Sequence, residues 1–213
     1  MFKTKNIFIT LLILCLSTAL FAGETKKTEI QNIKPLTQKE VIQKFISWDK
    51  NLKTLDTYYT QETSFEGTLI SKSEGHLLKM DKMLRIETLE EGKLTQYALT
   101  DKKVISIFDA KSNLIMQIFW DAWYATQQNK SLFDFGNYAK ILEDHKVNSF
   151  NTLEQGYKLV LTQKEGYPYT LTFLLDKNTF FPTEINLLSE GVNSKTVLQN
   201  TEINKDIPKE IFK

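Results

Sequence analysis

Cysteine and histidine are scarce in this sequence, and their scarcity excludes several kinds of chemistry. The 213 residues include one cysteine, Cys15, and two histidines, His76 and His145, which lie far apart. One cysteine cannot build a disulfide framework, and neither histidine has a carboxylate or a second histidine at metal-ligand spacing. The sequence therefore predicts no metal site, and we expect no cofactor.

An excess of one charge sign is missing as well, and so are the common catalytic motifs. The 27 basic side chains are balanced by 26 acidic ones, and the lysines are dispersed without an aromatic platform, which argues against a nucleic-acid-binding protein. No Gly-x-Ser-x-Gly elbow, P-loop or dinucleotide fingerprint occurs. The carboxylate pairs Glu90-Glu91 and Glu143-Asp144 adjoin turns or helix ends, where solvated charge is the ordinary explanation. We therefore do not expect an enzyme.

The first 22 residues have the form of a signal peptide. Lys3 and Lys5 precede a run over residues 7–21 that contains no charge, and the small residue Ala22 offers a cleavage site. An apolar run of about 15 residues is shorter than the roughly 20 that a spanning helix needs. We expect export with cleavage near Ala22; a membrane anchor and a lipid-modified Cys15 are the alternatives.

The chain after the cleavage site is expected to form one domain. Cleavage would remove two lysines and no acid, which leaves 25 basic and 26 acidic side chains and no cysteine. Residues 23–36 are polar and lack periodicity, so we expect a flexible leader. Residues 37–213 contain no Pro/Gly/Ser-rich linker and no internal repeat, which predicts a single domain stabilised by packing alone.

Order is expected to begin with a helix over residues 37–53. Thr37 and Glu40 match a capping box, in which both side chains accept hydrogen bonds from backbone N–H groups of the first turn. Apolar residues then follow helical spacing, namely Val41, Ile42, Phe45, Ile46, Trp48 and Leu52. From Leu55 the period changes to two, which is typical of an extended strand.

Short strands joined by tight turns account for most of the remaining chain. They are expected at 55–65, 67–73, 76–81, 83–89, 93–100, 103–109, 113–120, 146–150, 156–164, 169–175, 183–189 and 195–203. The turns are too short for crossover helices, so we predict an antiparallel meander. A second helix is expected over 131–144, beside Asn129-Lys130-Ser131, which fits a glycosylation sequon that has meaning only in a eukaryotic secretory route.

These elements predict a fold that is mainly β, of the α+β type, with about 10–11 strands. Right-handed twist accumulates across so wide a sheet, so it should curl toward a barrel or a deep saddle. Two helices cannot flank both faces of the sheet, so they should lie together in its concavity. Apolar doublets such as Leu77-Leu78 and Ile107-Phe108 place apolar atoms on both faces. One face is the core, and the other is either packed as well or a surface for a ligand or partner.

Several short stretches, in chain order, resemble the motifs of one known family. Tyr59-Thr60-Gln61 is similar to an opening strand that ends Phe-Thr-Gln, residues 75–86 to the strand-turn-strand that follows, and residues 100–109 to a Ser-Asp-Gly-Lys hairpin. Gln117 and residues 182–185 and 207–212 are similar to later parts of the same pattern. Over residues 37–213 the chain thus resembles the periplasmic lipoprotein carriers of the LolA type and their LolB-type receptor relatives.

Three positions depart from the family pattern. Met80-Asp81 stands where carriers place Arg-Pro, Lys102 replaces the hairpin glycine, and Leu84 and Ile86 replace aromatic residues. In the family the first arginine is associated with holding a lid closed over the empty cavity. Arg85 is the only arginine in this chain. We expect it to make a lid contact or another polar contact, because a guanidinium bonds carbonyls or carboxylates bidentately.

The resemblance implies an unclosed β-barrel whose helices cover the concave face, and a periplasmic carrier that shields the acyl chains of lipoproteins between inner and outer membranes. Exposing an acyl chain to water costs about 0.8 kcal/mol per CH₂, so such cargo needs shelter. The implied partners of this monomer are acylated lipoproteins, an inner-membrane lipoprotein-releasing ABC transporter and an outer-membrane receptor. The alternative is a lipid or lipoprotein sensor, or a glycolipid-binding module, of the same fold without a transport cycle.

The candidate binding residues are apolar or aromatic side chains of strands and of the second helical region. The predicted cavity lining comprises Leu55, Tyr59, Leu77, Leu84, Ile86, Tyr97, Leu99, Ile105, Ile107 and Phe119, and the predicted lid contacts are Phe133, Phe135 and Tyr138. Because neighbouring strand residues point to opposite faces, the sequence leaves open which of these side chains point inward.

Overall fold

The computed structural model describes residues 35–127, 129–166 and 168–213. The signal peptide expected over residues 1–22, with Cys15, lies outside the described residues, as does nearly all of the leader expected over residues 23–36.

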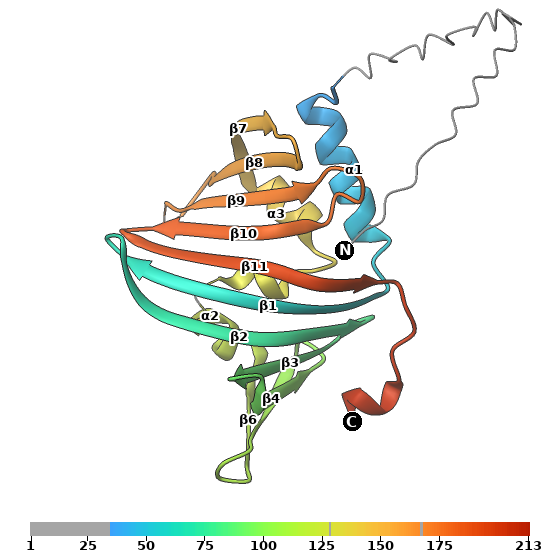
Figure 1. The fold of residues 1–213 in the computed structure, drawn as a ribbon, viewed down its shortest axis with the longest axis vertical. Coiled ribbons are helices and arrows are strands. Elements are labelled where there is room, and N and C mark those ends of the chain that lie inside the picture. Colours follow the sequence, from blue (N-terminus) through green and yellow to red (C-terminus); the bar gives the residue numbers. More distant parts are fainter. Residues whose placement is uncertain (1–34, 128, 167) are drawn as a thin grey trace, which may run out of the picture. The chain divides into compact units, whose positions relative to one another are not determined.

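Eleven antiparallel strands form one sheet in the described part of the chain (Figure 1). They are β1 (Thr54–Phe65), β2 (Thr68–Met80), β3 (Met83–Glu90), β4 (Lys93–Thr100), β5 (Val104–Asp109), β6 (Leu114–Phe119), β7 (His145–Thr152), β8 (Gly156–Gln163), β9 (Thr170–Asp176), β10 (Pro182–Ser189) and β11 (Val192–Ile203). The order across the sheet is β6-β5-β4-β3-β2-β1-β11-β10-β9-β8-β7. The first and last strands of the chain therefore pair in the middle, and β6 and β7 are the two edges.

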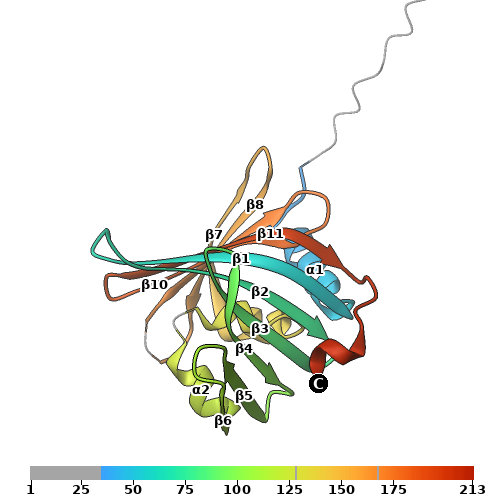
Figure 2. The same ribbon diagram turned by 60° about the horizontal axis from the view of Figure 1, so that its bottom comes forward.

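The chain crosses from one edge of the sheet to the other through short helices. These are α2 (Trp120–Thr126), the 3₁₀ helix η1 (Lys130–Phe133) and α3 (Tyr138–Asp144). Together with α1 (Gln38–Lys50) they lie on one face of the sheet, whose strands curve round them (Figure 2). We call these four helices the helical cover. Edges β6 and β7 do not pair with each other, so the predicted unclosed barrel with helices on its concave face is confirmed.

Helix α1 begins at the predicted capping box. The Thr37 backbone N–H donates to Glu40 Oε2 over 2.8 Å, and the Glu40 N–H donates to Thr37 Oγ1 over 3.4 Å. Val41 and Phe45 point from α1 into the core and are fully buried. The helix expected over residues 37–53 is therefore found, shorter by a few residues at its C-terminal end.

Two other expectations about elements were wrong. The strands expected at 67–73 and 76–81 are one continuous strand, β2, because Gly75 lies within the ladder and makes no turn. The helix expected over 131–144 is divided into η1 and α3, since Gly136 takes a left-handed conformation with φ +89° between them. Helix α2 occupies a segment for which the sequence predicted no helix.

Aromatic side chains fill the concave face beneath α1 and α3. Phe45 of α1 packs against Tyr138 of α3 and Phe173 of β9, with ring centroids 5.2 and 5.3 Å apart. These three side chains are fully buried, as are Leu159 and Leu171. We call this region, formed by β7–β10 with α1 and α3, the filled half.

None of the helices in the described ranges is long and apolar enough to cross a membrane.

Candidate binding cavity beneath the helical cover

Strand alternation divides the predicted lining residues between the two faces of the sheet. On β3, Leu84 and Ile86 point toward the helical cover, and their partners on β4 are Thr100 and Ala98. Seven of the predicted residues are buried on this covered face, namely Leu55, Tyr59, Leu77, Leu84, Ile86, Ile105 and Ile107. The predicted lid residues Phe133, Phe135 and Tyr138 belong to the cover or its loops and are buried in the same cluster.

Three predicted lining residues do not face the covered side. Tyr97 and Leu99 flank Ala98 on β4, and because Ala98 points inward, both of them point to the outer face. Phe119 ends the edge strand β6 and is 77% exposed. The sequence did not show which residues point inward, because adjacent residues on these strands are both apolar and either one could face the interior.

A cavity of about 280 Å³ lies between the cover and strands β1–β5. Its apolar wall comprises Ile86, Ala98, Ile107, Trp123, Leu132 and Phe133, and its polar wall comprises Gln61, Ser73, Thr88, Gln96, Gln127 and Asn129, with Tyr59 between them. We call this region, formed by β1–β5 with α2 and η1, the cavity half. No charged side chain is among these lining residues.

Tyr59 lies across the floor of the cavity because Gly75 has no side chain. A Cβ atom on Gly75 would lie 2.4 Å from the Tyr59 hydroxyl and 2.3 Å from the Glu87 carbonyl oxygen. Gly75 pairs with Tyr59 across the β1–β2 ladder, so the phenol can rest on the neighbouring strand. Burial raises the pKa of Tyr59 to about 12, so the hydroxyl is neutral at physiological pH.

The polar wall is the part of the site that the sequence prediction missed. Gln61 follows Tyr59 with the same strand parity, which is a signal that could have identified it. Asn129 carries no such signal, since in the sequence it is only the first residue of a sequon. It is 1% exposed, and its Nδ2 donates to the Ile185 carbonyl over 3.1 Å and to Thr196 Oγ1 over 2.9 Å. The sequon asparagine is thus buried and hydrogen-bonded inside the fold.

Buried carboxyl groups join the helices of the cover and their loops to one another. The Asp49 carboxylate at the end of α1 accepts hydrogen bonds from the backbone N–H groups of Gly136, over 2.6 Å, and Tyr138, over 2.8 Å. Desolvation by burial raises the pKa of Asp49, although both hydrogen bonds act in the opposite direction. Tyr124 of α2 donates to Asp134 Oδ2 over 2.6 Å. Of these contacts, the one from Tyr138 to Asp49 satisfies an N–H group in the first turn of α3.

Lys102 provides a further attachment from the β4–β5 hairpin. Its Nζ donates to the Phe133 carbonyl of η1 over 2.9 Å, and burial lowers the pKa of its ammonium group. Lys102 has φ +67°, in the left-handed region that favours glycine. The resemblance placed the family's hairpin glycine at this position, so a residue with a side chain occupies a glycine conformation here and contacts the cover.

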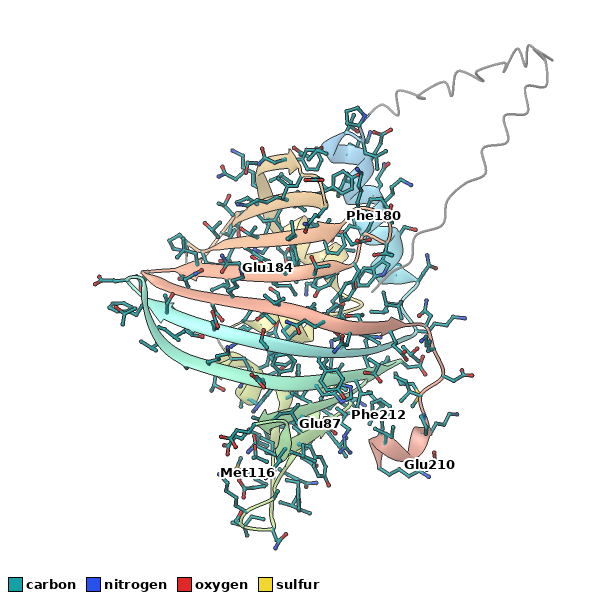
Figure 3. The ribbon with its side chains drawn as sticks, in the orientation of Figure 1. Glu87, Met116, Phe180, Glu184, Glu210 and Phe212 are labelled. Atoms are coloured by element: carbon teal, nitrogen blue, oxygen red, sulfur yellow. The ribbon has the colours of Figure 1, made fainter. Side chains whose placement is uncertain are left out.

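Arg85 makes the expected polar contact, but on the outer face of the sheet. It follows Leu84 on β3 and therefore points away from the cover. Its Nε donates to Glu87 Oε1 over 2.6 Å, and an Nη donates to the Ile211 carbonyl over 3.0 Å. Ile211 belongs to the C-terminal 3₁₀ helix η2 (Lys209–Phe212), which packs on β3 beside Glu87 (Figure 3). Arg85 thus joins the C-terminal segment to the sheet, and the expectation of a lid contact is corrected.

His76 completes this outer-face cluster. Its Nε2 lies 2.6 Å from Asp56 Oδ1 and its Nδ1 lies 3.1 Å from Glu87 Oε2, while its ring stacks on Tyr58 with centroids 4.2 Å apart. Burial lowers the pKa of His76, but the two carboxylates outweigh that effect and hold the pKa above its ordinary value. In the described ranges no three His, Cys, Asp or Glu side chains form a group that could hold a metal ion.

This chain is similar in fold to several proteins of known structure. No family model matches the chain, and no curated protein matches it. An uncharacterized conserved protein from Thermus thermophilus is 12% identical, with a TM-score of 0.52 over 82% of this chain and 92% of that one. A DUF1329 family protein from Desulfovibrio piger is 8% identical, with a TM-score of 0.52 over 82% of this chain and 96% of that one.

A LolA superfamily protein from Nitrosomonas europaea is 11% identical, with a TM-score of 0.48 over 84% of this chain and 98% of that one. At these identities the similarities concern the fold alone. The unclosed antiparallel sheet with helices across its concave face is the architecture that the sequence resemblance implied. The chain therefore has the unclosed fold that the sequence resemblance implied.

Proposed function

We propose that this protein is a periplasmic carrier that shields the acyl chains of lipoproteins beneath its helical cover. The observation that carries the proposal is the cavity on the concave face, with an apolar wall formed by strands β3–β5 and by η1. Each CH₂ group moved from water to such a wall gains about 0.8 kcal/mol. The proposed partners are acylated lipoproteins, a loading transporter in the inner membrane and a receptor in the outer membrane.

The size of the cavity implies that the cover moves when cargo enters. Its volume of about 280 Å³ is slightly below the range of roughly 300–1,000 Å³ that is usual for small-molecule pockets. The cover over this half is held by a few polar contacts, such as Lys102 to Phe133 and Tyr124 to Asp134. Breaking these contacts would release α2 and η1 and enlarge the space, while the filled half keeps the fold intact.

The test is to identify what the protein carries in the cell. The full chain, with its own N-terminal segment, is expressed in its native cell and purified from the envelope without detergent, and bound species are identified by native mass spectrometry. We expect acylated polypeptides. A glycolipid or phospholipid as the sole occupant would contradict the carrier proposal and support the lipid-binding alternative.

Two matched variants test whether the cavity is the site. Ile86→Glu places a carboxylate in the apolar wall, and Leu99→Glu places one on the outer face of the neighbouring strand. We expect at least ten-fold less bound cargo for Ile86→Glu, because a buried unpaired charge is strongly unfavourable, and unchanged cargo for Leu99→Glu. Equal cargo in both variants would show that the acyl chains bind elsewhere.

A further inference from the structure

Strand β6 is an edge of the sheet that lacks the usual protection against pairing with another chain. Among the described strands it pairs only with β5, and it lies at the lower end of the sheet in Figure 2. Proteins commonly protect an edge with a lysine, a proline or a bulge, because unpaired backbone groups attract further strands. The sequence of β6, Leu-Ile-Met-Gln-Ile-Phe, contains no charge and no proline, and its register with β5 is continuous.

The backbone of β6 offers three residues to a further strand. The Trp120 N–H, directly after β6, donates to the Lys103 carbonyl over 2.9 Å and therefore points toward β5. The backbone groups of successive residues in an antiparallel strand point alternately to its two sides. The N–H and C=O groups of Ile115, Gln117 and Phe119 therefore point away from β5, toward the side on which no described strand lies.

The side chains of β6 are apolar on both faces. Met116 pairs with the inward-pointing Ile107, so it lies on the covered face, as does Ile118. Ile115 and Phe119 alternate with them and lie on the outer face. Ile115, Met116 and Phe119 are 69%, 52% and 77% exposed, and Met116 lies at the periphery of the molecule in Figure 3. A strand added at this edge would remove these side chains from water.

We propose that β6 pairs in antiparallel fashion with β6 of a second copy of this chain, about a two-fold axis that passes through the pair formed by the two Gln117 residues. In this register Ile115 lies opposite Phe119 of the other copy, and Met116 lies opposite Ile118. All three free residues of the edge are then paired, and each of the exposed apolar side chains meets another apolar one. The dimer goes beyond the proposed function, and it differs from the monomer that the resemblance implied.

The charges of β6 and of its flanks favour a copy of the same strand as the occupant. No charged residue lies within the strand, so the pairing brings no like charges together. The antiparallel direction brings the end followed by the exposed Asp121 to the end that Lys111 precedes in the other copy. Lys111 is paired only with the exposed Glu90, over 3.2 Å, so its long side chain can turn to an acid across the interface. Opposite charges therefore meet at both ends of the strand pair.

The length of β6 sets the strength of the dimer. Six residues and their neighbours are fewer than the roughly 20–30 residues a side of a standard interface. The pairing should therefore be weak, reversible and dependent on concentration. A two-fold strand pair uses the same edge of both copies, so the assembly ends at two chains.

The test measures the oligomeric state of the full chain, purified after export, by sedimentation equilibrium from micromolar to millimolar concentration. We expect the mass to rise from one chain to two. Ile115→Lys places an edge lysine opposite Phe119 and should weaken the dimer at least ten-fold. Leu69→Lys is the matched control, because Leu69 is 57% exposed but lies on the interior strand β2, and it should leave the dimer unchanged. A monomer at every concentration, or equal effects of the two lysines, overturns the proposal.

A cysteine at the two-fold axis tests the register. The two Gln117 residues would form a hydrogen-bonded pair with Cα atoms about 5.5 Å apart, which suits a disulfide. In a chain with Cys15→Ser, Gln117→Cys should therefore form a covalent dimer with oxidised glutathione, and Leu69→Cys should not. Equal cross-linking of both variants, or none at Gln117→Cys, overturns this pairing.

A lipid surface is the competing occupant for exposed apolar side chains. Flotation with vesicles of phosphatidylethanolamine and phosphatidylglycerol compares the unaltered protein with Ile115→Lys. We expect the two proteins to bind the vesicles equally, because β6 is not a membrane contact. Vesicle binding that Ile115→Lys abolishes, by a protein that stays monomeric, overturns the dimer and assigns the edge to the membrane.

Discussion

The filled half and the cavity half share one sheet but differ in what lies between strands and cover. Beneath α1 and α3 the space is occupied by large aromatic side chains, with Phe45, Tyr138 and Phe173 in mutual contact. Beneath α2 and η1 the floor carries the small residues Ser73, Gly75 and Ala98, and a cavity remains. The comparison shows that one sheet can hold a rigid anchor and a binding space, because side-chain volume decides which half is filled.

Removing an aromatic ring from the filled half should have the largest effect on stability. Phe173→Ala deletes a fully buried ring that touches both Phe45 and Tyr138. We expect a loss of about 3–5 kcal/mol in the free energy of unfolding, as is usual for Phe→Ala in a core, measured by urea denaturation. A loss below about 1 kcal/mol would show that this half does not anchor the fold.

Filling the cavity should reduce the affinity for acyl chains and change the stability only slightly, the reverse of what is expected in the filled half. Ala98→Phe adds a ring at a position that lines the cavity, so acyl probes should lose at least ten-fold in affinity while stability changes by less than about 1.5 kcal/mol. Titration of a fluorescent acyl probe and urea denaturation measure the two quantities. If the variant binds normally, the cavity is not where acyl chains lie; if it unfolds, this half is as tightly packed as the other.

Lys102 tests whether the cover of the cavity half is latched. Lys102→Met keeps the strained φ of +67° but removes the donor to Phe133, so we expect a loss of about 1–2 kcal/mol. Lys102→Gly removes the same donor but relieves the strain, so its loss should be smaller by about 1 kcal/mol.

Both Lys102 variants should bind acyl probes faster than the unaltered protein, because η1 is released. Stopped-flow mixing measures the association rate, and hydrogen exchange of the amides in residues 130–138 measures opening of the cover. Unchanged rates in both variants would mean that the Lys102 contact does not control entry.

The smallest expected effect on stability comes from replacing His76, on the outer face of the sheet. The carboxylates of Asp56 and Glu87 raise the pKa of His76 above its ordinary value despite its burial, so protonated His76 stabilises the fold below about pH 6.5, and this contribution disappears as pH rises through the folded-state pKa. His76→Gln should therefore cost about 1 kcal/mol at pH 5.5 and almost nothing at pH 9. Urea denaturation at the two pH values measures this, and a cost that grows with pH would contradict the assignment.

Local sequence patterns predicted the helices and strands well. They failed where the role of a residue depends on a contact with a residue far away in the chain. The capping box at Thr37 and the period-two strands act within a few residues, so they were recognisable. Gly75 was interpreted as part of a turn because glycine usually marks one, whereas it makes room for Tyr59 on the neighbouring strand. The lining role of Asn129 depends on Ile185 and Thr196, more than fifty residues away in the chain.

The sequence by itself determined the approximate number and the order of the strands, the first helix and the apolar character of the interior, since these follow from backbone propensity and side-chain alternation over short ranges. Only the tertiary structure decided which face of each apolar doublet is covered and where packing leaves a cavity. The physical reason is that burial is a property of contacts between distant segments. Strand alternation places Leu84 and Arg85 on opposite faces, but only the position of the cover decides that the face with Leu84 is the buried one.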